Sequence, residues 1–116
     1  MSYENLSLQV VAGNKTLVCD NQINCVQREV KDSDYKFSIT NEKKLSYGNV
    51  ACYVNNQKLT CKNSQTNSKQ PVISDFKNLN TDFFLNPGGI AKCYLLSGNV
   101  ACATSNTTQK FRLVSK

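Results

Sequence analysis

The sequence of 116 residues predicts a small all-β domain that is stapled by disulfides. Residues that form helices well rarely line up at the 3.6-residue spacing of an amphipathic helix, so long helices are not expected. Six cysteines occur in a chain without histidine, a composition that favours disulfides over a metal site. Glycine and asparagine separate short β-like runs, as they do at tight turns. These observations predict strands joined by hairpins.

Length and apolar content indicate one domain, residues 1–116. The apolar share is 40%, which is enough for one modest core. No run of about 20 apolar residues could span a bilayer, so no membrane span is expected. The polar segment 63–71, NSQTNSKQP, is predicted to be an exposed loop inside the domain.

Nine segments are rich in residues that favour strands. They are 6–11, 16–19, 35–40, 50–54, 58–62, 82–85, 91–96, 100–103 and 110–114. The stretch CYVNNQKLTC places Asn55-Asn56 between two of them, and CYLLSGNVAC places Ser97-Gly98-Asn99 between two others. Because Asn and Gly tolerate the positive φ of tight turns, both stretches are predicted to be hairpins.

The cysteines can form three disulfides between sequence neighbours. They are Cys19, Cys25, Cys52, Cys61, Cys93 and Cys102. Five, eight and eight residues separate successive partners, so the short knuckles of zinc sites are absent and no metal is expected. Each disulfide between neighbours would close a short loop and contribute about 2–3 kcal/mol. The sequence itself allows 15 pairings, and reduced cysteines packed in the core are the alternative.

Cysteine content also bears on the compartment. Disulfides are typical of secreted and periplasmic proteins, and we expect this protein there. The residues after Met1, SYENLSLQVV, do not have the basic start and apolar core of a signal peptide. We therefore expect that a leader has been removed and that Met1 stands in its place.

The sequence contains an internal repeat. Residues 48–52, GNVAC, recur as residues 98–102, and residues 12–19, AGNKTLVC, form a third and weaker copy. An aromatic segment follows each copy. The spacing predicts three units, near residues 1–39, 40–85 and 86–116, which must share one core because none can bury its apolar face alone.

The segment 92–114, KCYLLSGNVACATSNTTQKFRLV, resembles a repeat of the ricin B chain-type β-trefoil lectins. The matching residues are Gly98-Asn99, Val100, Cys102 and Gln109-Lys110-Phe111. This resemblance implies a β-trefoil of three hairpin repeats and carbohydrate binding. Phe111 stands where that family has tryptophan, and Leu95 stands where it has an aspartate that holds sugar hydroxyls. Another small β-barrel or a β-sandwich is the alternative fold.

The net charge of +6 comes mostly from lysine, and only Arg28 and Arg112 are arginines. The lysines are not interleaved with arginines and aromatic residues as in nucleic-acid-binding segments, so no nucleic-acid partner is expected. A basic surface can instead be a simple solvated face, or it can attract anionic glycans, acidic proteins or a membrane surface.

No catalytic constellation is visible. Without histidine, acid–base chemistry near neutral pH would depend on carboxylates, lysine or tyrosine. Asp32-Ser33-Asp34 is predicted to be a turn, and Pro87-Gly88-Gly89 lacks the residues of a phosphate-binding loop. We expect no enzyme activity and no cofactor.

A binding site is the better expectation. Sugar sites combine an aromatic surface with amide side chains, and two constellations have this composition. They are Tyr47, Asn49 and Tyr53 in the second unit, and Tyr94, Asn99 and Gln109 in the third. Turn formation by Gly-Asn and packing of tyrosines in strands would account for the same residues structurally.

The sequence therefore predicts a secreted, non-catalytic binding module that recognises a glycan or a glycoprotein surface. A secreted protein-binding effector, inhibitor or toxin subunit would use the same stapled scaffold without a sugar pocket. A structural surface or pilus-type component is the third possibility, for which self-association would be the sign.

Overall fold

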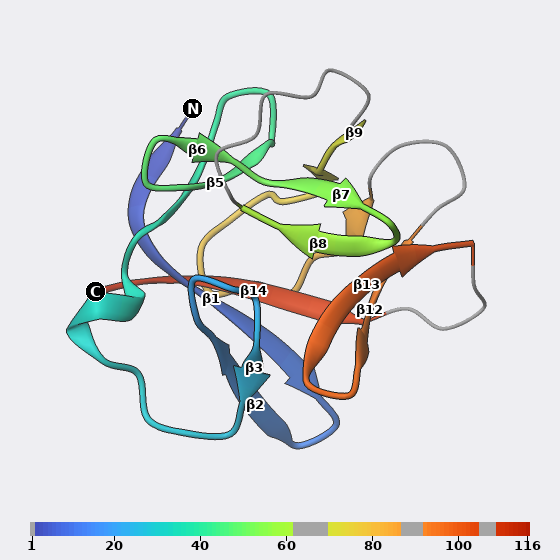
Figure 1. Cartoon of the computed structure of the whole chain (residues 1–116). Helices are drawn as coiled ribbons and strands as arrows, with labels where there is room; N and C mark the ends of the chain where they lie inside the picture. The colour runs from blue at the N-terminus through green and yellow to red at the C-terminus, as the bar shows by residue number, and fades with distance from the viewer. Residues whose placement is uncertain (1, 62–69, 87–91, 105–108) are drawn as a thin grey trace.

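The computed structural model of the chain describes residues 2–61, 70–86, 92–104 and 109–116 and is all-β (Figure 1). The elements in chain order are β1 (Tyr3–Ala12), β2 (Lys15–Cys19), β3 (Cys25–Val26), the 3-10 turn η1 (Asp32–Asp34), β4 (Phe37–Ile39), β5 (Leu45–Tyr47), β6 (Val50–Ala51), β7 (Tyr53–Asn55), β8 (Lys58–Thr60), β9 (Gln70–Pro71), β10 (Ile73–Ser74), β11 (Leu85–Asn86), β12 (Lys92–Leu96), β13 (Asn99–Ala103) and β14 (Lys110–Ser115). Within the described part of the chain, no helix is long and apolar enough to cross a membrane.

Strand β1 is the longest strand and pairs antiparallel with β2, β4 and β14. Its middle residues are buried on both faces. Leu6, Leu8 and Val10 point into the main core. Ser7 and Gln9 are also buried, and the Gln9 amide Nε2 donates to Ser7 Oγ at 3.4 Å. Figure 1 shows β1 and β14 crossing the middle of the molecule side by side.

Strand pairings, together with backbone hydrogen bonds that connect separate sheets at two points, link several strands in a ring. Strand β1 pairs with β4, and β4 pairs with β5. Just before β5, the Lys43 carbonyl accepts hydrogen bonds from the N–H (2.9 Å) and Oγ (3.1 Å) of Ser74 in β10. Strand β10 pairs with β11, and the backbones of Phe83 and Phe111 then exchange two hydrogen bonds of 2.9 and 2.8 Å. Phe111 belongs to β14, which returns to β1.

The core lies inside this ring. Its largest fully buried side chains come from β1, β4, β5, β8, β11 and β14 and from the β2–β3 turn, and include Leu8, Ile23, Phe37, Leu45, Leu59, Leu85 and Phe111. Aromatic contacts extend the core from Phe111 through Phe83 to Phe76. Each part of the chain therefore contributes to one shared core.

All six cysteines form disulfides, each within one hairpin. Cys19–Cys25 joins β2 to β3, Cys52–Cys61 flanks β7–β8, and Cys93–Cys102 joins β12 to β13. Of the 15 pairings that the sequence left open, the structure contains the one between sequence neighbours.

The turns of two hairpins differ by one residue from the predicted ones: the first is shifted and the second is shorter. In β7–β8 the turn residues are Asn56 and Gln57, with φ of 52° and 66°, whereas Asn55 pairs with Lys58. In β12–β13 the turn is Ser97-Gly98, and Asn99 is already in β13. The cause is the disulfide in each hairpin. Its two cysteines lie opposite each other on the two strands only when the turn is midway between them in the sequence.

Eight of the nine predicted strands overlap strands of the structure over at least half of their length. The predicted strand 82–85 is wrong: only Leu85 belongs to a strand, β11, and Phe83 forms an isolated bridge with Phe111. The predicted strand 50–54 is interrupted at Cys52 and forms β6 and β7, and the short strands β3, β5, β9 and β10 were not predicted. Most of the predicted loop 63–71 lies outside the described residues. Its last two residues, Gln70 and Pro71, instead form β9, where a proline is tolerated because β9 is an edge strand.

The two GNVAC copies occupy different positions, contrary to the prediction that they mark equivalent points of two units. Gly48-Asn49 forms the β5–β6 turn, and Cys52 then begins the disulfide hairpin. Gly98 instead lies in the turn at the tip of β12–β13, and Cys102 ends that hairpin. The Gly13-Asn14 turn between β1 and β2 matches the position of Gly48-Asn49. The two copies share a glycine with positive φ in a turn, at Gly48 and Gly98, but not a location in the fold.

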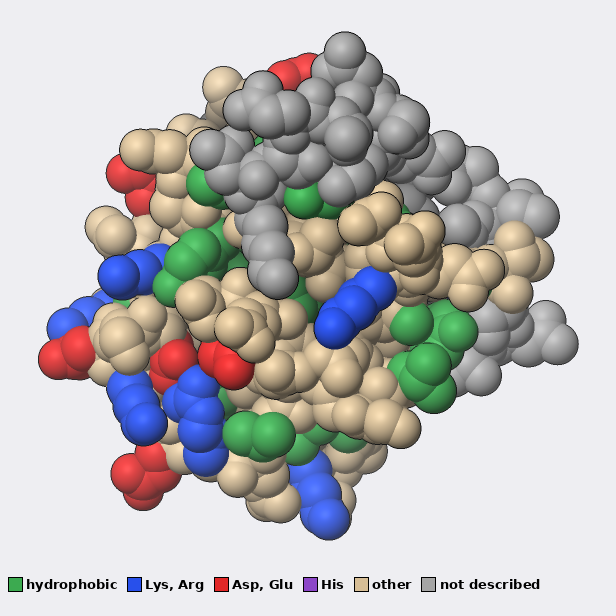
Figure 2. Space-filling view, in the orientation of Figure 1, with side chains coloured by type: hydrophobic (Ala, Val, Ile, Leu, Met, Phe, Trp, Pro, Cys, Tyr) green, Lys and Arg blue, Asp and Glu red, His purple; other side chains and the backbone are tan. Residues whose placement is uncertain are grey.

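An ion pair closes the segment between β3 and β4. The Arg28 guanidinium donates to both carboxylate oxygens of Asp34 at 2.7 and 2.8 Å, and the Lys31 N–H donates to Asp34 at 2.7 Å. The hydrogen bonds from Arg28, and then that from Lys31, hold the pKa of Asp34 below its ordinary value despite burial. Figure 2 shows acidic and basic side chains close together on this lower left part of the surface.

Replacing both Cys93 and Cys102 by alanine should lower the free energy of unfolding by about 2–3 kcal/mol, because the unfolded chain is no longer constrained by the short loop. Urea unfolding of the variant and of the parent protein measures this difference. Equal midpoints and slopes for the two proteins would contradict a stabilising role for this disulfide.

The substitution Asp34→Asn should destabilise the protein by about 2 kcal/mol at neutral pH, because it removes charge-assisted hydrogen bonds from a buried acceptor. The folded-state pKa of Asp34 is lowered from 3.8, so this stabilisation is present above that pH and is lost as the pH falls through the folded-state value. Urea unfolding at neutral pH and in acid should show the two proteins converging in acid. The control Asp32→Asn removes an exposed carboxylate, 2.9 Å from Lys116 Nζ, and should change stability little.

Candidate functional site

The first and third disulfide hairpins are joined by backbone hydrogen bonds. Asn24, just before β3, forms an antiparallel bridge with Asn99 at the start of β13. The Cys25 N–H donates to the Gly98 carbonyl at 2.7 Å. The tip of β12–β13 is therefore held against the loop between β2 and β3.

The third hairpin is also joined to the second. Ala101 of β13 pairs with Lys58 of β8, and the Cys102 N–H donates to the Gln57 carbonyl at 2.7 Å. Strands β12, β13, β8 and β7 consequently form one continuous sheet. All three disulfide hairpins meet around β13.

A hollow of about 450 Å³ lies where the three hairpins meet, and we call it the junction groove. Its lining residues come from all three hairpins and are Gln22, Asn24, Tyr53, Asn55, Lys58, Thr60 and Asn99. Four of these seven side chains are amides, which offer both hydrogen-bond donors and acceptors. The volume is within the range of small-ligand sites.

Strand alternation explains why the β7–β8 hairpin presents these side chains. Tyr53 lies opposite Thr60, and Asn55 lies opposite Lys58, so all four share one face of the hairpin. The other face carries Leu59, which is fully buried in the core. One face is therefore anchored in the core while the other lines the groove.

The wall from the first hairpin is shaped by an aspartate. Asp20 Oδ1 accepts hydrogen bonds from the backbone N–H groups of Gln22 (2.9 Å) and Asn24 (3.0 Å). Between them, Ile23 has a φ of 57° and its side chain is fully buried. The core contact and the capped turn together fix the backbone from which Gln22 and Asn24 reach the groove.

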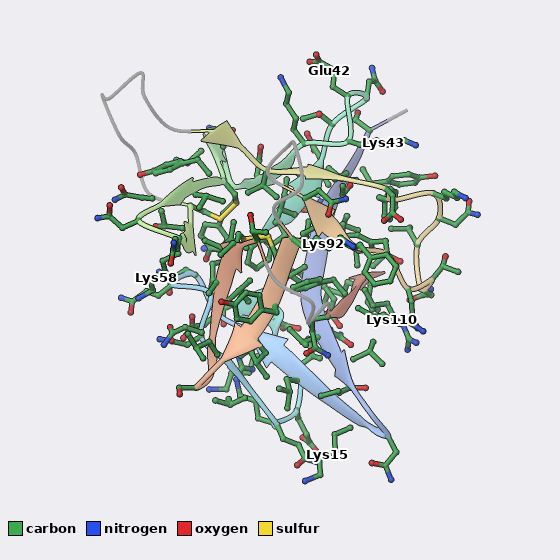
Figure 3. The ribbon with its side chains drawn as sticks, turned by 90° about the vertical axis from the view of Figure 1, so that its right-hand side faces the viewer. Lys15, Glu42, Lys43, Lys58, Lys92 and Lys110 are labelled. Carbon is green, nitrogen blue, oxygen red and sulfur yellow. A yellow bond between two sulfur atoms is a disulfide. The ribbon has the colours of Figure 1, made fainter. Side chains whose placement is uncertain are left out.

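A second hollow of about 380 Å³ adjoins the first and shares Lys58 and Asn99 with it. Its remaining lining residues are Asn56, Gln57, Tyr94, Leu96, Ser97, Val100 and Ala101. Tyr94 and Leu96 lie on the same face of β12–β13 as Asn99 and Ala101, by the same alternation. We call this the side hollow. Lys58 and Asn99 line both hollows and so form the boundary between them. Lys58 is labelled in Figure 3.

The structure brings three of the six predicted binding residues to these hollows. Tyr53 and Asn99 line the junction groove, and Tyr94 lines the side hollow together with Asn99. The two predicted constellations thus contribute to adjoining hollows and not to separate sites.

The other three predicted residues lie elsewhere. The ring of Tyr47 packs edge-on against Phe37, with 5.0 Å between ring centroids. Asn49 lines a separate hollow of about 200 Å³ with Glu4 and Lys36. The Gln109 amide Nε2 donates to the Val11 carbonyl at 2.6 Å and so ties the start of β14 to β1.

Five residues of the junction groove were not predicted as binding residues. They are Gln22, Asn24, Asn55, Lys58 and Thr60. The signal for three of them was present: Asn55, Lys58 and Thr60 alternate with apolar residues inside a cysteine-flanked hairpin. Gln22 and Asn24 carry no such signal, because only the contact between hairpins brings them to the groove.

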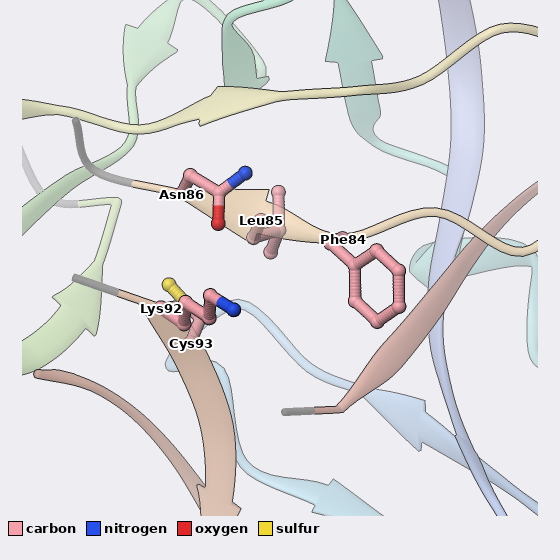
Figure 4. A pocket seen from close by; sticks show the side chains of 5 residues that line it. All are labelled: Phe84, Leu85, Asn86, Lys92 and Cys93. Atoms are coloured by element: carbon pink, nitrogen blue, oxygen red, sulfur yellow. The ribbon is translucent and has the colours of Figure 1, made fainter. Parts of the chain in front are cut away.

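A smaller hollow of about 230 Å³ lies between the end of β11 and the start of β12 (Figure 4). It is lined by Phe84, Leu85, Asn86, Lys92 and Cys93. The residues that connect Asn86 to Lys92 lie outside the described part of the chain. The junction groove is larger and is lined by described residues from all three hairpins, so it is the better candidate site.

No protein-family model, no curated protein and no solved structure matches this chain. Its function is inferred from the chemistry of the junction groove.

Proposed function

We propose that this protein is a secreted, non-catalytic carbohydrate-binding domain that holds its ligand in the junction groove. The observation that carries the proposal is the groove's lining, which combines amide side chains with a tyrosine and a threonine. Sugar hydroxyls both donate and accept hydrogen bonds, and an amide side chain can do the same from adjacent atoms. The faces of sugar rings also carry C–H groups that pack on aromatic rings, and Tyr53, which lines the groove, is the residue we propose for this contact.

Rigidity of the groove supports this function. Its walls are hairpins that are closed by disulfides and joined to each other by backbone hydrogen bonds. A preorganised site loses less conformational entropy when a ligand binds. Side chains on such walls can select a particular arrangement of hydroxyl groups.

The arrangement of the strands supports a β-trefoil-like architecture for the domain. The ring of linked strands contains two strand segments from each third of the chain, and each third adds one disulfide hairpin. The hairpins meet at one place. This is the arrangement that the resemblance of residues 92–114 to a ricin B chain-type repeat implies.

Three disulfides are typical of an oxidising compartment, either extracellular or periplasmic. A secreted location follows as part of the proposal. It fits a domain whose ligand is a glycan on a cell or in an extracellular matrix.

The substitution Tyr53→Ala should weaken glycan binding about tenfold, because it removes the aromatic surface from the groove. Asn55→Ala should also weaken binding, since Asn55 is exposed and faces the same hollow. A glycan array identifies ligands for the parent protein, and titration calorimetry with the best of them measures the loss in each variant.

The matched control is Tyr35→Ala, which removes a tyrosine that lines neither hollow. Its affinity should equal that of the parent protein, and circular dichroism should show that all the variants are folded. Absence of binding across a broad array, together with recovery of a stable protein partner, would instead favour the protein-binding effector. Concentration-dependent self-association without a ligand would favour the structural component.

A further inference from the structure

The charges of this protein are divided unevenly along the chain. Residues 1–42 contain six acidic and four basic residues. Residues 43–74 contain five lysines and no acidic residue, and residues 83–116 contain three lysines, one arginine and no acidic residue. The second and third disulfide hairpins both come from the parts that lack acidic residues. In Figure 2, described acidic side chains are visible on the left and at the top of this face but not on its right-hand part, where β8, β12 and β13 lie.

The described lining of the junction groove also has basic charge without acidic charge. Among the described residues that line the groove and the side hollow, Lys58 is the only charged one. Asp20 precedes the groove residues Gln22 and Asn24 in the chain. Its Oδ1 accepts hydrogen bonds from the backbone N–H groups of these two residues. An exposed ammonium group at the boundary of two uncharged polar hollows creates a local positive potential there.

The two hollows together also exceed the size of one sugar. The junction groove and the side hollow occupy about 450 and 380 Å³ and meet at Lys58 and Asn99. Each hollow contains one tyrosine, Tyr53 on one side of this boundary and Tyr94 on the other. The pair therefore offers two stacking surfaces on either side of one cation.

We infer that the ligand is an acidic oligosaccharide that spans both hollows and places a carboxylate or sulfate group at the Lys58 ammonium. This inference rests on the proposed function and adds the class of glycan. An ammonium group donates up to three hydrogen bonds, and those to an anionic oxygen are stronger than neutral ones. The amides on both sides supply partners for the hydroxyl groups of the adjoining sugars.

A glycan fits this arrangement better than a nucleic acid does. The described lining of both hollows contains one lysine and no arginine, whereas sites for the phosphate backbone use several cationic groups along a groove. A single cation between amide-rich hollows matches a ligand with one acidic group among many hydroxyls. A nucleic acid is therefore one of the outcomes that the experiment must separate.

The experiment compares the parent protein with Lys58→Gln by titration calorimetry. The probes are sialyllactose with its neutral counterpart lactose, a hyaluronan tetrasaccharide and a sulfated chondroitin tetrasaccharide. The parent protein should bind at least one acidic probe about tenfold more tightly than lactose, and Lys58→Gln should remove most of that preference. Binding of the acidic probe should also weaken as salt is added. Stronger binding of the hyaluronan than of the chondroitin probe would assign the anion as a carboxylate, and the reverse would assign a sulfate.

The matched control is Lys15→Gln, which removes the same charge from the β1–β2 hairpin. Lys15 lines neither hollow, and Figure 3 shows it at the opposite end of that view from Lys43 and well apart from Lys58. This variant should change the affinity for the acidic probe by less than about twofold, because the distant charge is screened.

Each outcome decides between the hypotheses. Equal binding of acidic and neutral probes, or no effect of Lys58→Gln, overturns the acidic ligand while leaving glycan binding intact. Tighter binding of a single-stranded oligonucleotide than of any glycan overturns both the inference and the glycan function. No binding of any probe, with no hit on a broad glycan array, overturns the proposed function itself.

Discussion

Register within the disulfide hairpins is the constraint on which the junction groove depends. A disulfide joins residues that face each other across antiparallel strands, so Cys52–Cys61 fixes Asn56-Gln57 as the turn of β7–β8. A shift of one residue would move every side chain of a strand to the opposite face. Tyr53 and Lys58 would then point into the core and Leu59 into solvent. The covalent links therefore determine which side chains can reach a ligand.

The same constraint explains how much of the structure was predictable. Composition and cysteine number predicted an all-β fold with disulfides. The flanked hairpins offered pairing between sequence neighbours, but the sequence alone could not select it from the 15 possibilities. Long strands with clear alternation, such as β1 and β14, were also predictable. Strands of two or three residues, such as β3 and β10, contain too few residues to show a period.

Prediction of the site was limited by contacts between hairpins. Alternation within CYVNNQKLTC and CYLLSGNVAC could have placed Tyr53 and Lys58, and Tyr94 and Asn99, on outward faces. No local pattern shows that Asn24 pairs with Asn99, since these residues are far apart in the chain. The recurrence of GNVAC was misleading for a related reason. The glycine of each copy, Gly48 or Gly98, serves a turn that needs positive φ, so the motif reports local backbone geometry and not a place in the fold.

The two hairpins that flank Lys58 present comparable faces with different chemistry. Counting from the first cysteine of each, Tyr53 corresponds to Tyr94, and Lys58 corresponds to Asn99. The pairing of Ala101 with Lys58 places these faces side by side in one sheet. Both hollows therefore have a tyrosine, but only their shared boundary has a charge. A ligand that follows this sheet meets an aromatic ring, a cation beside an amide, and a second aromatic ring in sequence. That order of contacts is the physical basis on which we propose a short acidic oligosaccharide, and not a single neutral sugar, as the ligand.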